Sequence, residues 1–242
     1  MSDNRYTQRT IVKHTLTSGL LDAPRELRVY LPPGYNELSS YPVIYGQDGE
    51  DLFNYGRIAT HMNRLILDEN VQPAIIVGIE VDKSKRTSEY APDGSRYAAY
   101  AQFVATELVP YIEARYPARP DVTERILVGD SLGGTVSLHL ALDYPYLFQN
   151  VIALSGAFLS TTHERLARES SLSWLRLWQL IGTDEREVKT ERGTFDFLEL
   201  NRTAREWFER RNVQLTYVEK PGKHLWGFWQ QELPEALKAF LG

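Results

Sequence analysis

The five residues from Gly129 to Gly133 constrain the fold most, because they join an apolar run to a helical pattern. Ile126 to Val128 is short and apolar, as in a buried strand, and Leu132 to Leu142 has the composition of a helix. Ser131 therefore falls on a tight strand-to-helix turn of the form G-x-S-x-G, with the helix N-terminus directed at its hydroxyl. The alternative is a glycine-rich turn in which Ser131 only caps the helix.

Apolar runs and helical patterns alternate through the rest of the chain. Buried strands are predicted at 42–45, 74–81, 151–154 and 175–181, further strands at 9–17, 26–31 and 213–218, and helices at 96–116, 197–211 and 233–241. Such alternation predicts an α/β fold with a mostly parallel central sheet and helices on both faces. The length of 242 residues, of which 43% are hydrophobic, suits one domain that spans residues 1–242.

Composition excludes several classes of protein. The net charge of −5 does not favour a nucleic-acid or membrane-surface partner, and the absence of cysteine excludes disulfides, thiolate metal sites and thiol nucleophiles. Residues 1–10 are polar and lack the apolar core of a signal peptide, so we expect a cytoplasmic protein. We expect no metal and no cofactor, and the oligomeric state stays open.

A serine hydroxyl needs a base within hydrogen-bond reach before it can act as a nucleophile. Of the five histidines, His224 follows a predicted strand and precedes the last helix, the place that the chain order serine, acid, histidine requires. The alternative for His224 is a surface-loop residue beside Trp226. The remaining histidines lie on an edge strand, in helical stretches or in an irregular polar segment: His14, His61, His139 and His163.

The acid that orients such a histidine is expected after the strand at 175–181. Asp184 and Glu185 both lie there, and spacing alone does not separate them; Glu187 and Asp196 are weaker candidates. For the oxyanion, the residue after the nucleophile normally supplies one backbone N–H, here Leu132.

The second N–H is expected from the turn Gln47-Asp48-Gly49-Glu50 after the third strand. We expect the N–H of Glu50 there, with that of Gly49 as second choice. An ordinary Asp-Gly turn is the alternative.

With these candidate serine, histidine, acid and oxyanion residues, the chain resembles the putative-esterase family of α/β-hydrolases, in its enterochelin-esterase-like branch of siderophore esterases. The resemblance covers about residues 25–241 and is carried by Asp48-Gly49, Arg86-Thr87-Ser88-Glu89-Tyr90, Gly129 to Gly134, Gly182-Thr183-Asp184-Glu185 and Gly222-Lys223-His224-Leu225-Trp226. In that family the acid stands three residues after the glycine that closes its strand, which implies Glu185. Lys223 replaces a glycine of the family pattern, and the usual His-Gly oxyanion turn is Asp48-Gly49 here.

The resemblance implies a serine esterase without a cofactor that hydrolyses a small-molecule ester, with a catecholate trilactone siderophore as the candidate substrate. The basic loop Lys83-Ser84-Lys85-Arg86 suits an anionic ligand, and aryl rings would stack on Tyr90, Trp226 or Trp229. The alternative is a solvated loop in which Arg86 pairs with Glu89. Residues 158–173, with His163, Arg165 and Arg168, are expected as an irregular cap or a plain surface excursion.

Other functions fit the same residues. They are a general short-chain carboxylesterase, a feruloyl or acetyl esterase, an acyltransferase, and a hydrolase fold without catalysis that serves as a binding module. The presence of serine, acid and histidine in the required order argues against the last.

Overall fold

The computed structural model describes residues 4–242 and contains an eight-stranded sheet in the order β1-β2-β4-β3-β5-β6-β7-β10. β2 is antiparallel to β1 and β4, and the other neighbouring strands are parallel, so the predicted α/β fold with a mostly parallel sheet is confirmed. The strands are β1 (Thr10–Leu16), β2 (Arg25–Leu31), β3 (Val43–Gly46), β4 (Ile75–Ile79), β5 (Arg125–Asp130), β6 (Asn150–Leu154), β7 (Arg176–Gly182) and β10 (Gln214–Lys220).

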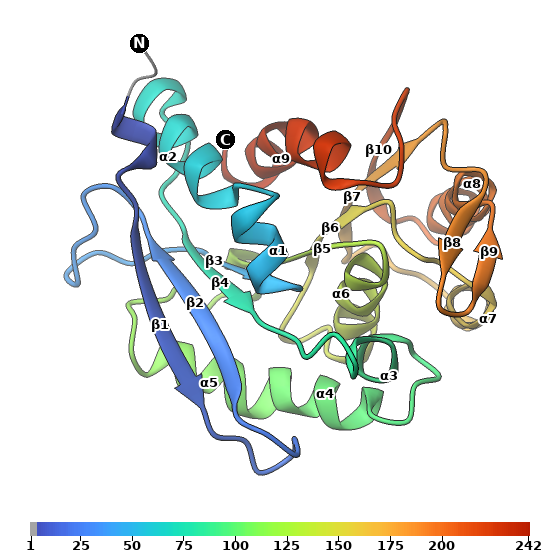
Figure 1. Ribbon diagram of the computed structural model, residues 1–242, viewed down its shortest axis with the longest axis horizontal. Helices are drawn as coiled ribbons and strands as arrows, with labels where there is room; N and C mark the ends of the chain where they lie inside the picture. The colour runs from blue at the N-terminus through green and yellow to red at the C-terminus, as the bar shows by residue number, and fades with distance from the viewer. Residues whose placement is uncertain (1–3) are drawn as a thin grey trace.

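Helices cover both faces of the sheet (Figure 1). One face carries α1 (Gly49–Asn54), α2 (Ile58–Glu69) and α9 (Trp226–Leu241), and the other carries α4 (Tyr97–Phe103), α5 (Val109–Glu113), α6 (Leu132–Asp143) and α8 (Phe197–Arg210). Successive strand residues point to opposite faces of the sheet. Val43 and Tyr45 pack in the core beneath α4, α5, α6 and α8, whereas Ile44 packs in the core beneath α1, α2 and α9. Both faces are therefore apolar, which explains the unbroken apolar runs in the sequence.

Some elements differ from the sequence prediction. The helix expected at 96–116 is interrupted by a π-helical turn (Val104–Leu108) between α4 and α5, and the last helix begins at Trp226 rather than Leu233. Residues 158–173 were expected to be irregular, but they contain α7 (Ser160–Arg168), whose Leu166 is fully buried. Because α7 has only a narrow apolar face, its polar composition hid it.

α2 contains His61, which was expected in a helical stretch without stated bounds. Further elements had no sequence prediction: α1, the short α3 (Arg86–Tyr90) and a two-stranded hairpin of β8 (Val188–Thr190) and β9 (Gly193–Phe195). The hairpin lies between β7 and α8, outside the main sheet, beside α7 (Figure 1). Residues 1–3 of the polar N-terminal stretch lie outside the described residues.

The carboxyl ends of the parallel strands place the segments of interest at one edge of the sheet. Ser131 follows β5, Glu185 follows β7, and His224 follows β10. Loops at this edge are free of ladder hydrogen bonds and can converge on a ligand.

Candidate active site

Ser131 occupies a strained turn between β5 and α6. Its φ of 52° and ψ of −121° lie outside the usual regions for a residue with a side chain. The turn is held by the Ser131 N–H, which donates to the Leu154 carbonyl at 2.8 Å. Gly129 makes it sterically feasible, because a Cβ there would lie 2.3 Å from the Gly133 carbonyl oxygen.

The structure brings Ser131, His224 and Glu185 into one hydrogen-bonded chain. The Ser131 hydroxyl lies 2.9 Å from His224 Nε2, and His224 Nδ1 lies 2.5 Å from Glu185 Oε2. Since a carboxylate only accepts, Nδ1–H donates to Glu185 and Nε2 is left to accept from Ser131. Asp184, in contrast to Glu185, is exposed, and its backbone N–H donates to the Gly222 carbonyl at 3.1 Å.

Glu185 is fully buried, with 0% of its side chain exposed, and its second oxygen also has partners. Oε1 accepts from the Gly182 N–H at 2.9 Å and from the Ser155 hydroxyl at 2.6 Å. The His224 ring lies edge-on between Phe197 and Trp229, with centroid distances of 4.7 and 4.8 Å. Sequence reasoning assigned no role to Ser155 or Phe197; a small polar residue directly after a predicted buried strand was the available signal for Ser155.

The turn after β3 is held by α3. Arg86 donates two hydrogen bonds of 2.7 Å to the buried Asp48 carboxylate, from Nε to Oδ1 and from Nη2 to Oδ2. The expected alternative that Arg86 pairs with Glu89 is therefore wrong. The Asp48 N–H donates to the Tyr90 hydroxyl at 3.2 Å, so both ends of α3 contact this residue.

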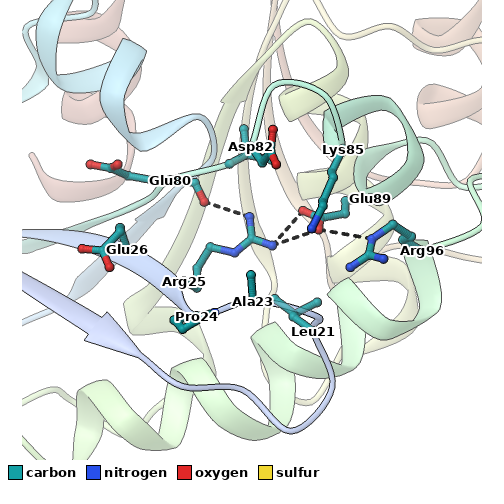
Figure 2. Close-up of a pocket in the computed structure, with 11 residues that line it drawn as sticks. Leu21, Ala23, Pro24, Arg25, Glu26, Glu80, Asp82, Lys85, Glu89 and Arg96 are labelled. Atoms are coloured by element: carbon teal, nitrogen blue, oxygen red, sulfur yellow. Dashed lines mark hydrogen bonds and ion pairs between the residues drawn. The ribbon is translucent and has the colours of Figure 1, made fainter.

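The far side of α3 is anchored by a buried ion pair (Figure 2). Arg25 Nη2 donates to both Glu89 oxygens at 2.8 and 3.0 Å, and Arg25 Nη1 donates to the Glu80 carbonyl at 2.9 Å. Only 8% of the Arg25 side chain and 1% of the Glu89 side chain are exposed. This pair holds α3 against β2 and β4, and thereby fixes the position from which Arg86 reaches the turn.

Asp130 directly precedes the nucleophile and is buried beside this turn. Burial, together with the nearby charge of Asp48, raises the pKa of Asp130 to about 7. Its Oδ1 has no hydrogen-bond partner within residues 4–242. One guanidinium, that of Arg86, thus lies near two buried carboxyl groups.

A cavity of about 390 Å³ opens beside Ser131 and His224. Its apolar lining consists of Leu132, Ala157, Leu159, Phe195 and Phe197, and its polar lining of Lys83, Arg86, Thr87, Lys189, Thr190, Glu191 and Arg192. The polar residues come from the loop before α3, from α3 itself and from the β8–β9 hairpin.

The predicted binding residues divide between the cavity and its surroundings. Arg86 and Leu132 line the cavity, whereas Tyr90, Trp226 and Glu50 do not. Tyr90 is fully buried, so the expectation that an aryl ring stacks on it is wrong; it supports the Asp48 turn instead. Trp226 packs against Trp229 at a centroid distance of 5.4 Å. Glu50 is the second residue of α1, where a backbone N–H lacks a helical acceptor, and its role stays a prediction.

The cap predicted at 158–173 contributes Leu159 to the cavity, and the β8–β9 hairpin contributes more of the wall. Two exposed polar contacts join this hairpin to the opposite side: the Thr87 hydroxyl donates to Glu191 at 2.6 Å, and Arg192 donates to Asp93 at 2.8 Å. The predicted cap thus forms only the edge of the cavity.

Two features of residues 4–242 bear on other classes of function. None of the helices there combines the length and the apolar composition that a bilayer crossing needs. No group of three or more histidine and acidic side chains there is arranged to hold a metal ion.

Comparison with known proteins places this geometry in context. The family model described as "Putative esterase" matches residues 18–240. The uncharacterized protein YjcH of Bacillus subtilis is 36% identical over 96% of this chain and 98% of its own length.

Solved structures of esterases share the fold. The enterobactin esterase FES of Shigella flexneri superposes with a TM-score of 0.82 at 20% identity, covering 96% of this chain and 59% of that one. This chain thus spans about three fifths of the Shigella enzyme. A ferulic acid esterase superposes with a TM-score of 0.83 at 20% identity, over 97% of this chain and 98% of that one.

Proposed function

This chain belongs to the putative esterase family, and from that membership we propose that it hydrolyses carboxylic esters through a Ser131–His224–Glu185 triad. The observation that carries the proposal is the hydrogen-bonded chain from the Ser131 hydroxyl to the buried Glu185 carboxylate. A serine on a strained turn, a histidine with one nitrogen free to accept and a buried acid are the parts that acyl transfer to serine requires.

The reaction has two steps. His224 Nε2 takes the Ser131 proton as Oγ forms a bond to the ester carbonyl carbon, and the carbonyl oxygen becomes negative. His224 then gives that proton to the alkoxide as the C–O bond breaks, which leaves an acyl-Ser131. Water, deprotonated by His224, cleaves this intermediate by the same route and restores the serine.

The oxyanion is assigned to backbone N–H groups at two helix starts. Leu132 is the first residue of α6, and Gly49 and Glu50 are the first two of α1. N–H groups at these positions have no acceptor within their own helix and carry partial positive charge. Asp48, with φ of 49°, turns the chain into α1, so its contacts with Arg86 fix the direction of these donors.

The first test is the single change Ser131→Ala in the purified protein, assayed on short p-nitrophenyl esters. Because the triad acts as a unit, we expect kcat to fall by about 10⁶-fold while the fold is retained. A fluorophosphonate probe should label the unmodified protein and not the variant. Near-normal turnover by Ser131→Ala would contradict the proposal, and the absence of both turnover and labelling in the unmodified protein would favour a binding module.

The cavity supports an anionic, partly aromatic substrate. Three of its four cationic side chains already face carboxylates: Arg86 faces Asp48, Lys83 faces Asp51, and Arg192 faces Asp93. The side chain of the fourth, Lys189, is exposed and has no ion-pair partner within the described part of the chain. Phe195 and Phe197 supply aromatic rings to the lining of the same cavity.

We assign this cavity to one aryl arm of a catecholate trilactone ester, whose negative charge would face Lys189. The test compares kcat/KM for a ferric trilactone, a feruloyl ester and short acyl esters, in the unmodified protein and in Lys189→Met. We expect the trilactone to be preferred and Lys189→Met to lower kcat/KM for it alone.

Preference for short neutral acyl groups, unaffected by Lys189→Met, would indicate a general short-chain or acetyl esterase. Ester products formed with an added alcohol would indicate an acyltransferase.

A further inference from the structure

A second hydrogen-bonded chain lies behind Glu185, on the side away from His224. The Trp229 indole N–H donates to the Ser155 hydroxyl oxygen at 2.8 Å, and the Ser155 hydroxyl donates to Glu185 Oε1 at 2.6 Å. All three residues are buried: counted over the whole residue, 3% of Trp229, 0% of Ser155 and 1% of Glu185 are exposed. Water has little access, so each donor depends on its single protein partner.

Ser155 occupies a backbone conformation that favours glycine. It directly follows β6 with a φ of 48°, where a residue with a side chain is strained. Its N–H donates to the Leu180 carbonyl at 2.8 Å, which ties this turn to β7, the strand that leads to Glu185. Packing alone does not require a hydroxyl here, since glycine would relieve the strain.

We propose that Ser155 and Trp229 are positioning residues that act through Glu185: their hydrogen bonds fix the carboxylate so that only Oε2 faces His224. This inference rests on the proposed function, because it assigns these residues to the same triad. The Gly182 N–H and the Ser155 hydroxyl together saturate Oε1. Without the hydroxyl, the carboxylate can rotate, and its charge is less dispersed.

Trp229 also contacts His224 directly through its ring. The two rings meet at an interplanar angle of 88°, and Phe197 packs on the other side of the imidazole at 84°. Trp229 lies in the first turn of α9, which begins two residues after His224. One side chain thus sets the plane of the imidazole and, through Ser155, the plane of the carboxylate that it faces.

The loss of a hydrogen-bond donor to Glu185 Oε1 should shift the pH dependence of activity in a predictable direction. A carboxylate with one hydrogen bond fewer attracts the Nδ1 proton more strongly, which stabilises the imidazolium form of His224. The acidic limb of kcat/KM against pH should therefore move to higher pH. A purely structural role of Ser155 would lower stability without moving this limb.

Four variants separate the effects. Ser155→Ala and Ser155→Gly both remove the hydroxyl but differ in backbone strain, so an effect that both share belongs to the hydrogen bond. Trp229→Phe keeps an aromatic ring and removes the N–H, and the double variant Ser155→Ala/Trp229→Phe tests whether the two act in series. The matched control is Ser137→Ala, because Ser137 in α6 is equally buried and its hydroxyl has no hydrogen-bond partner among the described residues.

The measurement is kcat and KM from pH 5 to 9 on a neutral ester. We expect both Ser155 variants to lower kcat about tenfold with little change in KM, and to move the acidic limb up by about half a pH unit. Trp229→Phe should do the same to a smaller extent, and the double variant should match Ser155→Ala. An acidic limb that stays in place in both Ser155 variants would overturn the proposal, as would full additivity with Trp229→Phe.

A second readout does not depend on turnover. The His224 Nδ1 proton, hydrogen-bonded to a buried carboxylate, should give a far-downfield proton NMR signal. We expect this signal to move in both Ser155 variants and to stay unchanged in Ser137→Ala; no movement would overturn the inference even if no ester is hydrolysed.

The surrounding charges are the same in all variants. The charged groups that line the cavity with His224 are Lys83, Arg86, Lys189, Glu191 and Arg192. The difference in pH dependence between the variants therefore reports on Glu185 and not on the charged groups that line the cavity. Failure of the unmodified protein to hydrolyse any ester would refute the proposed function, whereas a turnover-competent protein with an unmoved limb would refute only this inference.

Discussion

The substitution Asp130→Asn should remove a pH dependence of stability that originates beside the nucleophile. Asp130 is buried at the end of β5, and its pKa is raised to about 7 by burial and by the charge of Asp48. An aspartate in an unfolded chain titrates near 3.9. Between these two values the unfolded state has lost the proton and the folded state still holds it, so the free energy of unfolding falls as pH rises.

The magnitude follows from the same values. Each pH unit in this interval lowers the free energy of unfolding by about 1.4 kcal/mol. The interval of about three units therefore gives an upper bound of about 4 kcal/mol for the total decrease. The loss is complete above pH 7, where both states are ionised. From pH 5 to pH 8 the free energy of unfolding of the unmodified protein should therefore fall by about 3 kcal/mol, a decrease that Asp130→Asn should not show. The charge of Arg86 lowers the pKa of Asp130 and so opposes part of the effect of burial.

Urea unfolding at a series of pH values measures this directly. All other titrating groups are shared, so the difference in unfolding free energy between the two proteins isolates Asp130. As pH rises from 5 to 7, we expect the unfolding free energy of Asp130→Asn to increase relative to that of the unmodified protein. Above pH 7 the difference should stay level. A difference that is constant across this range would refute the assignment of a protonated, buried Asp130.

Further variants test the other parts of the site. Glu185→Gln should lower kcat by about 10⁴-fold, because the amide favours the wrong imidazole tautomer, whereas the exposed Asp184→Asn should stay within about twofold in the same ester assay. Arg86→Met should lower the free energy of unfolding by about 3 kcal/mol in urea, since the Asp48 carboxylate, 2% exposed, loses both guanidinium hydrogen bonds and keeps only the exposed Lys83 ammonium at 4.0 Å. Gly129→Ala should lower the melting temperature sharply, because its Cβ would lie 2.3 Å from a backbone carbonyl; an unchanged melting curve would show that the turn is not this tight.

Local pattern predicted much of the central architecture. Buried parallel strands are apolar on both faces, so short unbroken apolar runs located β4, β5, β6 and β7 to within about three residues. α6 was equally clear from its apolar composition. In contrast, α7 and the β8–β9 hairpin were missed, because short polar elements that pack at the edge of a core have little apolar periodicity.

The pairings within the site were harder to predict than its members. Arg86 was expected to pair with Glu89, a neighbour on the same short helix, but it reaches Asp48 while Arg25 takes Glu89. Tyr90 was expected to contact the substrate, but its hydroxyl instead accepts a hydrogen bond from the Asp48 N–H in the turn after β3. Such choices depend on distances between segments 38 or more residues apart along the chain, on which local sequence carries no information.

The sequence by itself determined that a serine would sit on a strained turn between a buried strand and a helix, because glycine spacing and apolar runs act over a few residues. It also placed His224 and an acid after strands whose ends share one edge of a parallel sheet. Spacing along the chain left Asp184 and Glu185 open, and the family resemblance implied Glu185, which the tertiary structure brings to the imidazole. Only the tertiary structure decided that Ser155 and Trp229 stand behind it. Those contacts form where loops from β6, β7 and β10 converge, and that convergence depends on how the whole sheet twists and packs.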